Sequence, residues 1–122
     1  MSYNVRFGSK YGNKKTEYNG RKYDSKFEAR IAQELELRQK AGEFTEIEPQ
    51  FRIKLYTYLP DGSKVDIFTY ICDFRCHKPD GTYLLCEAKG HVTDVYRTKR
   101  KLLDLVWLPD HPEYEFEEVR QR

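Results

Sequence analysis

Two acidic residues and a lysine, Asp73, Glu87 and Lys89, have the types and spacing of a metal-dependent hydrolytic site. Carboxylates placed opposite each other in a sheet repel by about 0.2–1 kcal/mol, and a divalent cation between them offsets that cost. Mg²⁺ takes one or two protein carboxylates, keeps several waters and accepts a phosphate oxygen. A lysine beside such an ion can hold the attacking water and stabilise charge on a phosphate. The alternative is a solvated sheet face with a diagonal Asp73–Lys89 ion pair.

These residues depend on a predicted β-hairpin for their position. Residues 70–76 and 82–89 have strand composition, and Pro79-Asp80-Gly81 is typical of the turn between them. A three-residue turn pairs Lys78 with Thr82, and counting inward from that pair places Asp73 directly opposite Glu87. Because side chains alternate along a strand, Lys89 lies on the face of both acids. The other face is apolar and carries Cys72, Phe74, Leu84, Cys86 and Ala88.

A third acid, Glu28, lies on a helix predicted over residues 23–41, which Gly42 would end. It borders the apolar stripe of Phe27, Ile31 and Leu35, so its carboxylate is expected to point towards the sheet. Ser25-x-x-Glu28 is also a capping box, in which the glutamate reaches back to the helix N-terminus. Both interpretations stay open from the sequence.

The remaining segments predict a meander, a second helix and a closing strand. Residues 51–58 and 64–75 read as strands joined by Pro60-Asp61-Gly62, and residues 114–119 as an edge strand. Pairing Leu59 with Ser63 sets Leu55 opposite Ile67 and Phe51 opposite Ile71. These four residues share the face of Asp73, so the first helix is expected to pack on that face. Gln50 lies at the same edge and is a further site candidate.

A helix over residues 94–105, with Thr93 as its N-cap, is expected after Gly90. Its predicted inward residues are Val95, Leu102, Leu105 and Val106. The same helix carries candidate phosphate-binding residues: Arg97, Lys99, Arg100 and Lys101. A solvated charged face is the alternative interpretation of that run.

The first 22 residues carry six basic residues and one acidic residue, whereas the whole chain has a net charge of +2. Residues 1–15 are expected to form a flexible basic and aromatic arm, with a short hairpin over residues 16–23 around Asn19-Gly20. Such an arm could bind nucleic acid through Lys14, Lys15, Arg21 and Lys22. A solvated terminus without a role is the alternative.

Length and composition favour one domain, residues 16–122, in a soluble intracellular protein, because no segment is apolar enough to span a membrane. Cys72, Cys76 and Cys86 lack the number and spacing of a disulfide framework and are expected to be buried thiols. A zinc site that adds His77 or His91 is the alternative for these cysteines.

The order of these features resembles the PD-(D/E)xK (restriction-endonuclease-like) nuclease superfamily. More narrowly, the chain resembles a small phage-borne nuclease family related to archaeal-type Holliday junction resolvases. The segments that carry this resemblance are residues 18–29, Ile47-Glu48-Pro49-Gln50-Phe51, Cys72-Asp73-Phe74 and Glu87-Ala88-Lys89-Gly90 followed by Thr93. The resemblance implies an α/β fold with an αβββαβ core, in which helices flank a mixed sheet. Cys72 departs from it, since the eponymous motif has proline before the aspartate.

The resemblance also implies specific roles for several residues. Asp73, Glu87 and the Ala88 carbonyl would bind Mg²⁺, for which Mn²⁺ is expected to substitute. Lys89 would be the catalytic lysine and Glu28 a second-metal or water ligand, while Lys99 and Lys101 match basic positions of the family.

The function expected from the residues and the resemblance together is a Mg²⁺-dependent DNA endonuclease, and the resemblance implies that it leaves 5′-phosphate ends. By analogy with the related resolvases, branched DNA is the expected substrate and a homodimer the expected assembly, with the host cytoplasm as the expected location if a phage encodes the chain. Two alternatives stay open. One is a non-catalytic DNA-binding or recombination-accessory protein, and the other is a structural or packaging-associated phage protein.

Overall fold

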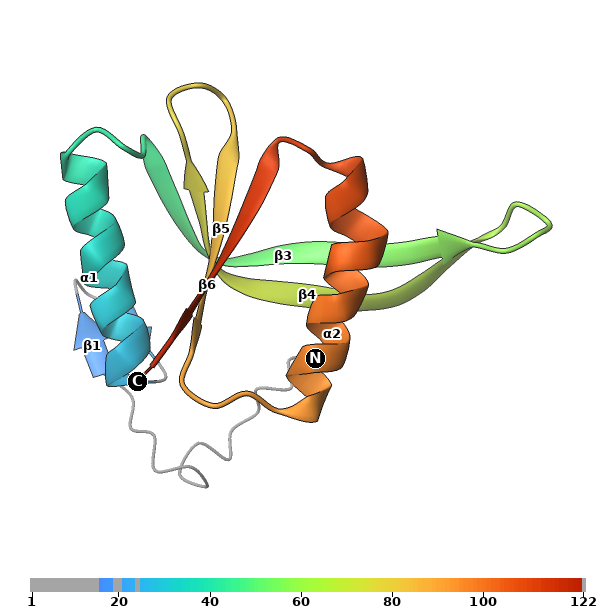
Figure 1. Ribbon diagram of the computed structural model, residues 1–122, viewed down its shortest axis with the longest axis horizontal. Coiled ribbons are helices and arrows are strands. Elements are labelled where there is room, and N and C mark those ends of the chain that lie inside the picture. Colours follow the sequence, from blue (N-terminus) through green and yellow to red (C-terminus); the bar gives the residue numbers. More distant parts are fainter. Residues whose placement is uncertain (1–15, 19–20, 24, 122) are drawn as a thin grey trace.

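A computed structural model describes residues 16–18, 21–23 and 25–121 (Figure 1). The elements, in chain order, are β1 (Thr16–Tyr18), β2 (Arg21–Tyr23), α1 (Lys26–Lys40), β3 (Glu46–Tyr58), β4 (Lys64–His77), β5 (Tyr83–Lys89), α2 (Asp94–Leu102), the π-helix η2 (Leu103–Trp107), the 3₁₀-helix η3 (Leu108–Asp110) and β6 (Tyr114–Arg120). The predicted hairpin of β1 and β2 and the predicted αβββαβ order are therefore confirmed. The expected arm, with Lys14 and Lys15, lies outside the described residues.

The main sheet has the strand order β3-β4-β5-β6. The first three strands are antiparallel neighbours, and β6 runs parallel to β5 after the crossover through α2. The sheet is therefore mixed, as predicted. The predicted closing strand β6 lies at one edge, and β3 lies at the other.

The β4–β5 hairpin has the predicted register. The Lys78 amide donates to the Thr82 carbonyl over 2.9 Å, and Gly81 has a φ of 89°. Cross-strand pairs run from His77 with Tyr83 to Phe74 with Cys86. The next position along this register brings Asp73 opposite Glu87.

The β3–β4 hairpin departs from its predicted register by one residue. The Leu59 amide does donate to the Ser63 carbonyl, over 2.9 Å, as expected. A β-bulge next to Leu55 then shifts the partners, so that Leu55 pairs with Phe68 and Phe51 with Cys72. The predicted partners, Ile67 and Ile71, were wrong because one extra residue on β4 changes which side chains face the core.

Both strands of this hairpin change direction near the centre of the view in Figure 1, and their loop end projects away from the rest of the chain. Pairs are formed by Pro49 with Phe74 and by Phe51 with Cys72, so Gln50 and Asp73 lie between them. Gln50 has a φ of 54°, a left-handed backbone conformation that is uncommon for residues other than glycine. Gln50, which lies opposite Asp73, therefore interrupts the regular extended backbone of β3.

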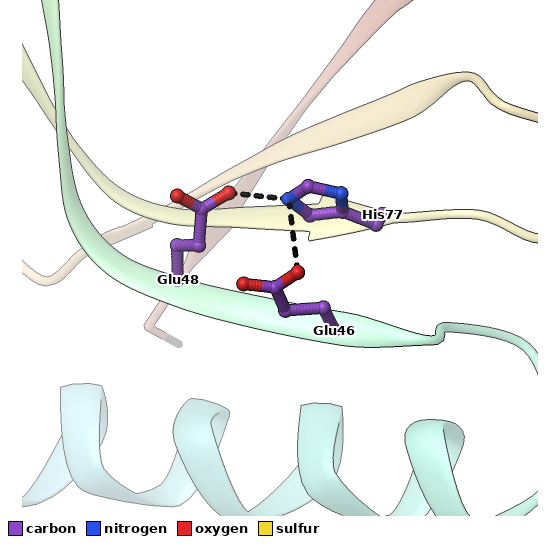
Figure 2. Close-up of side chains that lie close together, drawn as sticks. All are labelled: Glu46, Glu48 and His77. Atoms are coloured by element: carbon purple, nitrogen blue, oxygen red, sulfur yellow. Dashed lines mark hydrogen bonds and ion pairs between the residues drawn. The ribbon is translucent and has the colours of Figure 1, made fainter.

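Near the N-terminal end of β3, ion pairs hold β3 to β4. Glu48 hydrogen-bonds to His77, and the nearest oxygen of Glu46 lies 3.9 Å from the same histidine nitrogen (Figure 2). Arg75 donates from Nε to Glu48 over 2.7 Å. These side-chain interactions connect β3 to β4 in addition to the backbone hydrogen bonds of the sheet.

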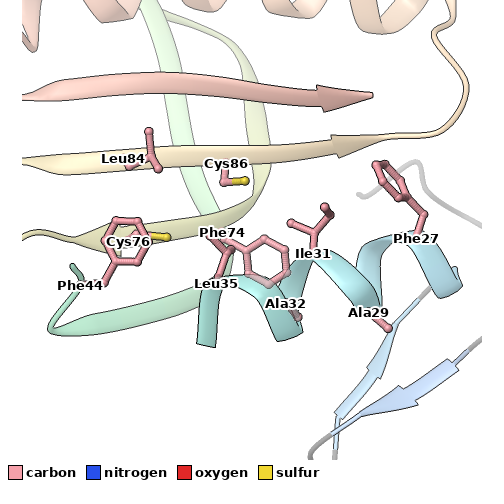
Figure 3. Packing of buried hydrophobic residues seen from close by; sticks show 10 residues of the cluster. All are labelled: Phe27, Ala29, Ile31, Ala32, Leu35, Phe44, Phe74, Cys76, Leu84 and Cys86. Atoms are coloured by element: carbon pink, nitrogen blue, oxygen red, sulfur yellow. The ribbon is translucent and has the colours of Figure 1, made fainter. Parts of the chain in front are cut away.

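Helix α1 covers one face of the sheet. Its buried residues Phe27, Ile31 and Leu35 point towards strand residues that include Phe74 and Cys86 (Figure 3). We expected α1 on the face of Asp73, and this was wrong. Phe74 and Cys86 alternate with Asp73 and Glu87, so α1 covers the apolar side of the β4–β5 hairpin, where it buries more apolar surface.

The second helical segment covers the opposite face. Thr93 caps α2 as predicted, and its side chain accepts a hydrogen bond from the Tyr96 amide. Tyr96 and Leu103 are the buried residues of this segment. Val95 and Leu105 were predicted to face inward but are exposed. The π-helix η2 changes the angle between successive side chains, so a regular α-helical period misplaces Leu105. Val95 is exposed because its neighbour Tyr96 is the residue of that turn which packs inward.

The three cysteines are buried and free, as predicted. Burial raises the pKa of the Cys76 thiol to about 12 and raises the thiol pKa of Cys72 and Cys86 as well. Among the described residues, no helix is long and apolar enough to cross a membrane.

Candidate functional site

A cavity of about 460 Å³ brings together the residues predicted for catalysis. Glu28 comes from α1, Asp73 from β4, and Glu87 and Lys89 from β5. The rest of its lining consists of Ser25, Ala88, Gly90, His91, Thr93 and Gln121. Side chains that are far apart in the sequence therefore surround one space beside the start of α1, the interior of β4 and the end of β5.

The Asp73 carboxylate is fixed by the neighbouring strand. Its Oδ2 accepts a hydrogen bond of 2.8 Å from the Ala88 amide. The backbone pairing of β4 with β5 ends at Phe74 and Cys86, one residue before Asp73 and Glu87 would pair. A side-chain oxygen of Asp73 thus bonds a β5 amide where the strand ladder ends, and this holds the carboxyl group against Glu87.

Glu87 is a buried acid, with 4% of its surface exposed. Burial raises the pKa of its carboxyl group well above 4.5, and the adjacent negative charge of Asp73 raises it further. Lys89 and a hydrogen bond from Tyr70 oppose this effect. The Tyr70 hydroxyl donates to Oε1 over 3.1 Å, while Lys89 Nζ lies 3.9 Å from Oε2. A buried carboxylate beside a second, half-buried carboxylate is costly without a nearby cation.

Lys89 is held between Glu87 and an aromatic ring. Its Nζ lies 4.2 Å from the centroid of the Tyr96 ring, a cation–π distance. The Tyr96 hydroxyl in turn donates to Oε1 of Glu118 over 2.6 Å, which fixes the ring relative to β6. The ammonium group is therefore positioned beside the acids by a buried residue of α2.

The structure shows the Ser25 half of the predicted capping box and places the Glu28 side chain at the cavity. The Ser25 hydroxyl accepts a hydrogen bond from the Glu28 amide over 3.1 Å, which caps α1. The Glu28 side chain is buried and lines the cavity, where its Oε2 accepts from Gln50 Nε2 over 3.4 Å. The backbone of Glu28 serves the cap, and its carboxylate faces the candidate site.

The donor set of the cavity suits a hard divalent cation. Glu28, Asp73 and Glu87 offer carboxylate oxygens, which Mg²⁺ prefers, and no cysteine lines the cavity. The pair formed by buried Glu87 and half-buried Asp73 supplies the charge that such an ion would neutralise. We regard this pair as the core of the candidate metal site, with Glu28 beside it.

A second group of possible metal ligands lies outside the cavity. Among the described residues, the ligand atoms of Glu46, Glu48 and His77 lie within 4.8 Å of one another. Burial disfavours the ionised form of Glu48, but hydrogen bonds from His77 and Arg75 outweigh it and lower the pKa of this acid. Arg75 already supplies a positive charge there, and none of the three residues lines the cavity. The group is explained as an internal ion network, and it contains no cysteine that could complete the alternative zinc site.

The basic residues of α2 differ in what they contact. The Arg100 guanidinium lies 3.6 Å from the centroid of the Phe116 ring and pairs with Asp104 and Glu118, so it joins α2 to β6. Lys101 and Arg97 are exposed, and Arg97 pairs with Asp94. Lys99 Nζ lies 5.3 Å from the Phe68 ring centroid. Arg21 and Lys22 are described only as backbone positions of β2.

Sequence reasoning missed several residues around the cavity. Tyr70, Tyr96 and Gln121 gave no signal, because buried tyrosines and a glutamine near the end of the chain are typical of any small domain. Gln121 is near the site since its amide donates to the Lys89 carbonyl over 3.1 Å. Gly90 leaves room for it, because a Cβ there would lie 3.0 Å from Gln121 Oε1.

Comparisons with known proteins match one family and nothing more specific. No curated protein and no solved structure matches the chain. Residues 8–120 match a family described as "Protein of unknown function (DUF1064)". The match spans nearly the whole chain, including every residue of the cavity lining except Gln121. The chain therefore belongs to the DUF1064 family.

Proposed function

We propose that this chain is a metal-dependent endonuclease of the PD-(D/E)xK type that hydrolyses phosphodiester bonds in DNA. The observation that carries the proposal is the convergence of Glu28, Asp73, Glu87 and Lys89 on one cavity. Three acids and an amine around one space are the groups that water-mediated phosphoryl transfer requires. The cavity also opens between elements, which gives a phosphate access to it.

Each residue of the cavity has a defined task in this proposal. Asp73 and Glu87 hold the metal ion, helped by the Ala88 carbonyl, and Glu28 orients the attacking water. Tyr70 fixes the orientation of Glu87 through its hydrogen bond. When bound, Mg²⁺, or Mn²⁺ in its place, neutralises the acids, polarises the phosphate and lowers the pKa of water.

Lys89 acts on the substrate from its position beside Glu87. Its ammonium group would donate a hydrogen bond to a non-bridging phosphate oxygen, where negative charge grows in the transition state. A bond forms between the oxygen of water and phosphorus, and the bond from phosphorus to the 3′ oxygen breaks. The water's proton passes to Glu28 or to solvent, and a solvent proton completes the 3′-hydroxyl, which leaves a 5′-phosphate end.

The substrate we propose is branched DNA such as a four-way junction, cut by a homodimer in the host cytoplasm. A two-fold dimer presents two identical sites to two strands of a junction. Recognition by backbone shape rather than base sequence agrees with a chain in which no base-reading motif was identified.

The test incubates the protein with labelled four-way junction, flap, single-stranded and linear duplex DNA, with Mg²⁺, Mn²⁺ or EDTA. The Lys89→Ala variant is expected to lose about 10²–10³-fold in cleavage rate, the scale found for removal of one transition-state donor. Lys78→Ala is the matched control, because Lys78 pairs with Glu115 and does not line the cavity.

Each outcome bears on a separate part of the proposal. Cleavage by Lys89→Ala at the parental rate would refute the role of Lys89. Equal cutting of all four substrates would remove junction selectivity and keep the nuclease. Salt-sensitive DNA binding without cleavage, unaffected by EDTA and by Glu87→Ala, would instead favour the non-catalytic DNA-binding alternative.

A further inference from the structure

One face of the projecting β3–β4 hairpin is basic and aromatic, and the proposed chemistry does not use it. Along β3 the side chains of Arg52, Lys54 and Tyr56 are exposed, whereas the intervening Ile53 and Leu55 are buried. Tyr58 continues the exposed series and pairs across the ribbon with Lys64 of β4. We call the set Arg52, Lys54, Tyr56, Tyr58 and Lys64 the ribbon face.

The three cations of the ribbon face lack acidic partners. In the part of the chain that the structure describes, none of the ion pairs involves Arg52, Lys54 or Lys64. Other basic side chains, such as Arg38, Arg75 and Lys78, pair with glutamates. Asp66, opposite Tyr56, is the acid nearest to them in the pairing. The face therefore carries a positive surplus.

The tyrosines of the ribbon face present ring surface to solvent. Tyr58 is 62% exposed and Tyr56 38% exposed, whereas Tyr70 and Tyr96 are buried. The two rings meet edge to face with centroids 6.0 Å apart. Lys64 Nζ lies 3.7 Å from the Tyr56 ring centroid, so cation and ring are already arranged together. Exposed rings interleaved with cations are typical of nucleic-acid surfaces.

The ribbon face begins at the candidate site. Gln50, which bonds Glu28, and Arg52 are alternate residues of β3 and are both exposed. On β4, Thr69 and Ile71 lie opposite Lys54 and Arg52, and Asp73 follows them at the cavity. The basic face therefore runs outward from the acids along the ribbon.

We propose that the ribbon face binds the sugar-phosphate backbone of the DNA arm that leads into the cavity. The assignment to DNA rests on the proposed function, and the basic surplus complements a polyanion. A two-stranded ribbon also fits a DNA groove. Lys64 lies nine residues from Asp73 along β4, so the contact extends up to about 30 Å from the acids, or roughly nine base pairs.

The test measures binding of fluorescein-labelled duplex and four-way junction DNA by anisotropy in EDTA, which keeps the DNA intact. The triple variant Arg52→Gln/Lys54→Gln/Lys64→Gln should raise the Kd about tenfold or more. It should also make the dependence of log K on log salt shallower by about two to three, close to one per lost phosphate contact. The control variant Arg30→Gln/Lys40→Gln/Lys78→Gln removes the same charge elsewhere and should bind within twofold of the parent.

The outcomes separate this proposal from the proposed function. Parental affinity in the triple variant, or an equal loss in the control, overturns the ribbon face even if the protein cuts DNA. Loss of affinity in the triple variant alone supports the ribbon face even if no DNA is cut. If the triple variant only disrupts self-association in sedimentation and leaves DNA affinity unchanged, the face belongs to a second copy and the proposal fails.

A second measurement uses the unaltered chain and so does not depend on folding of a variant. Bound 30-base-pair duplex should slow acetylation of Lys54 and Lys64 severalfold and leave Lys40 unchanged. A six-base-pair duplex should protect the lysines much less, since it cannot reach along the ribbon and into the cavity together. Equal acetylation of all three lysines with and without the long duplex would overturn the proposal.

Discussion

The Tyr70 hydroxyl donates a hydrogen bond to Oε1 of Glu87 over 3.1 Å, and both side chains are buried. Tyr70 belongs to β4 and Glu87 to β5, so the bond crosses the strands directly beneath the cavity. It stabilises the ionised carboxylate, against the effects of burial and of Asp73. Tyr70 thus hydrogen-bonds the proposed metal ligand Glu87 without itself lining the cavity.

Replacement of Tyr70 by phenylalanine is expected to shift the pH dependence of DNA cleavage. The variant loses the donor that favours ionised Glu87, so the acidic limb of the rate profile should move to higher pH. The rate at neutral pH should fall about tenfold and recover at higher pH. Tyr83→Phe is the control, because it removes the hydroxyl of a tyrosine that neither lines the cavity nor belongs to the ribbon face. An unchanged acidic limb in Tyr70→Phe would separate Tyr70 from the site.

The buried Glu87 carboxyl should make the metal-free protein less stable as pH rises. Burial, and then Asp73, raise its pKa well above 4.5, so the folded state binds the proton more tightly than the unfolded state. The free energy of unfolding therefore falls from about pH 4.5 up to the raised pKa, and the loss is complete above it. Glu87→Gln removes this titration.

Urea unfolding in EDTA at pH 5 and pH 8 measures this effect. Glu87→Gln should exceed the parent in stability by about 1–2 kcal/mol at pH 8, and this difference should shrink at pH 5. Added Mg²⁺ should stabilise the parent more at pH 8 than at pH 5 and leave the variant nearly unchanged. A variant less stable than the parent at pH 8 would contradict the raised pKa.

The register of the β4–β5 hairpin could be predicted from the sequence because a short turn determines it. Pro79-Asp80-Gly81 fixes the Lys78–Thr82 pair, and no irregularity intervenes before Phe74 and Cys86. The position of Asp73 opposite Glu87 follows from this. Because this turn fixes their pairing, the sequence was enough to place Asp73 and Glu87 together, whereas the position of Glu28 depends on the packing of α1.

The other hairpin shows what sequence could not predict. The Leu59–Ser63 pair followed from its turn, yet a bulge beside Leu55 changed the register, and Gln50 has a left-handed backbone conformation within β3. No glycine or proline lies beside the bulge, and Pro49 before Gln50 does not predict the positive φ of the residue that follows it. The face covered by α1 and the exposed side chains of the ribbon depend on these two irregularities, which arise from packing in three dimensions.

Because the backbone of Gln50 is strained, a substitution there is expected to raise the stability of the fold and lower the cleavage rate. A non-glycine residue at a φ of 54° costs about 1 kcal/mol, and Gln50 is exposed, so Gln50→Gly should stabilise the fold by about 0.5–1 kcal/mol. It also removes the hydrogen bond to Glu28 and should slow cleavage severalfold. Gln50→Ala keeps the strain and should slow cleavage without stabilising. Thermal unfolding and cleavage rates distinguish these effects, and full activity in both variants would remove Gln50 from the site.

Arg100 and Lys101 are neighbours on α2 that sequence could not tell apart, and the structure predicts opposite effects for them. Arg100 stacks on Phe116 and pairs with Glu118, so Arg100→Ala should lower the free energy of unfolding by about 1–2 kcal/mol. Lys101 is exposed, and Lys101→Ala should leave stability within about 0.5 kcal/mol of the parent.

If α2 contacts phosphates, Lys101→Ala should weaken DNA binding about twofold to fivefold at 100 mM salt, whereas a folded Arg100→Lys variant should bind normally. Urea unfolding and anisotropy measure the two effects, and a stability loss in Lys101→Ala equal to that in Arg100→Ala would refute this division of roles.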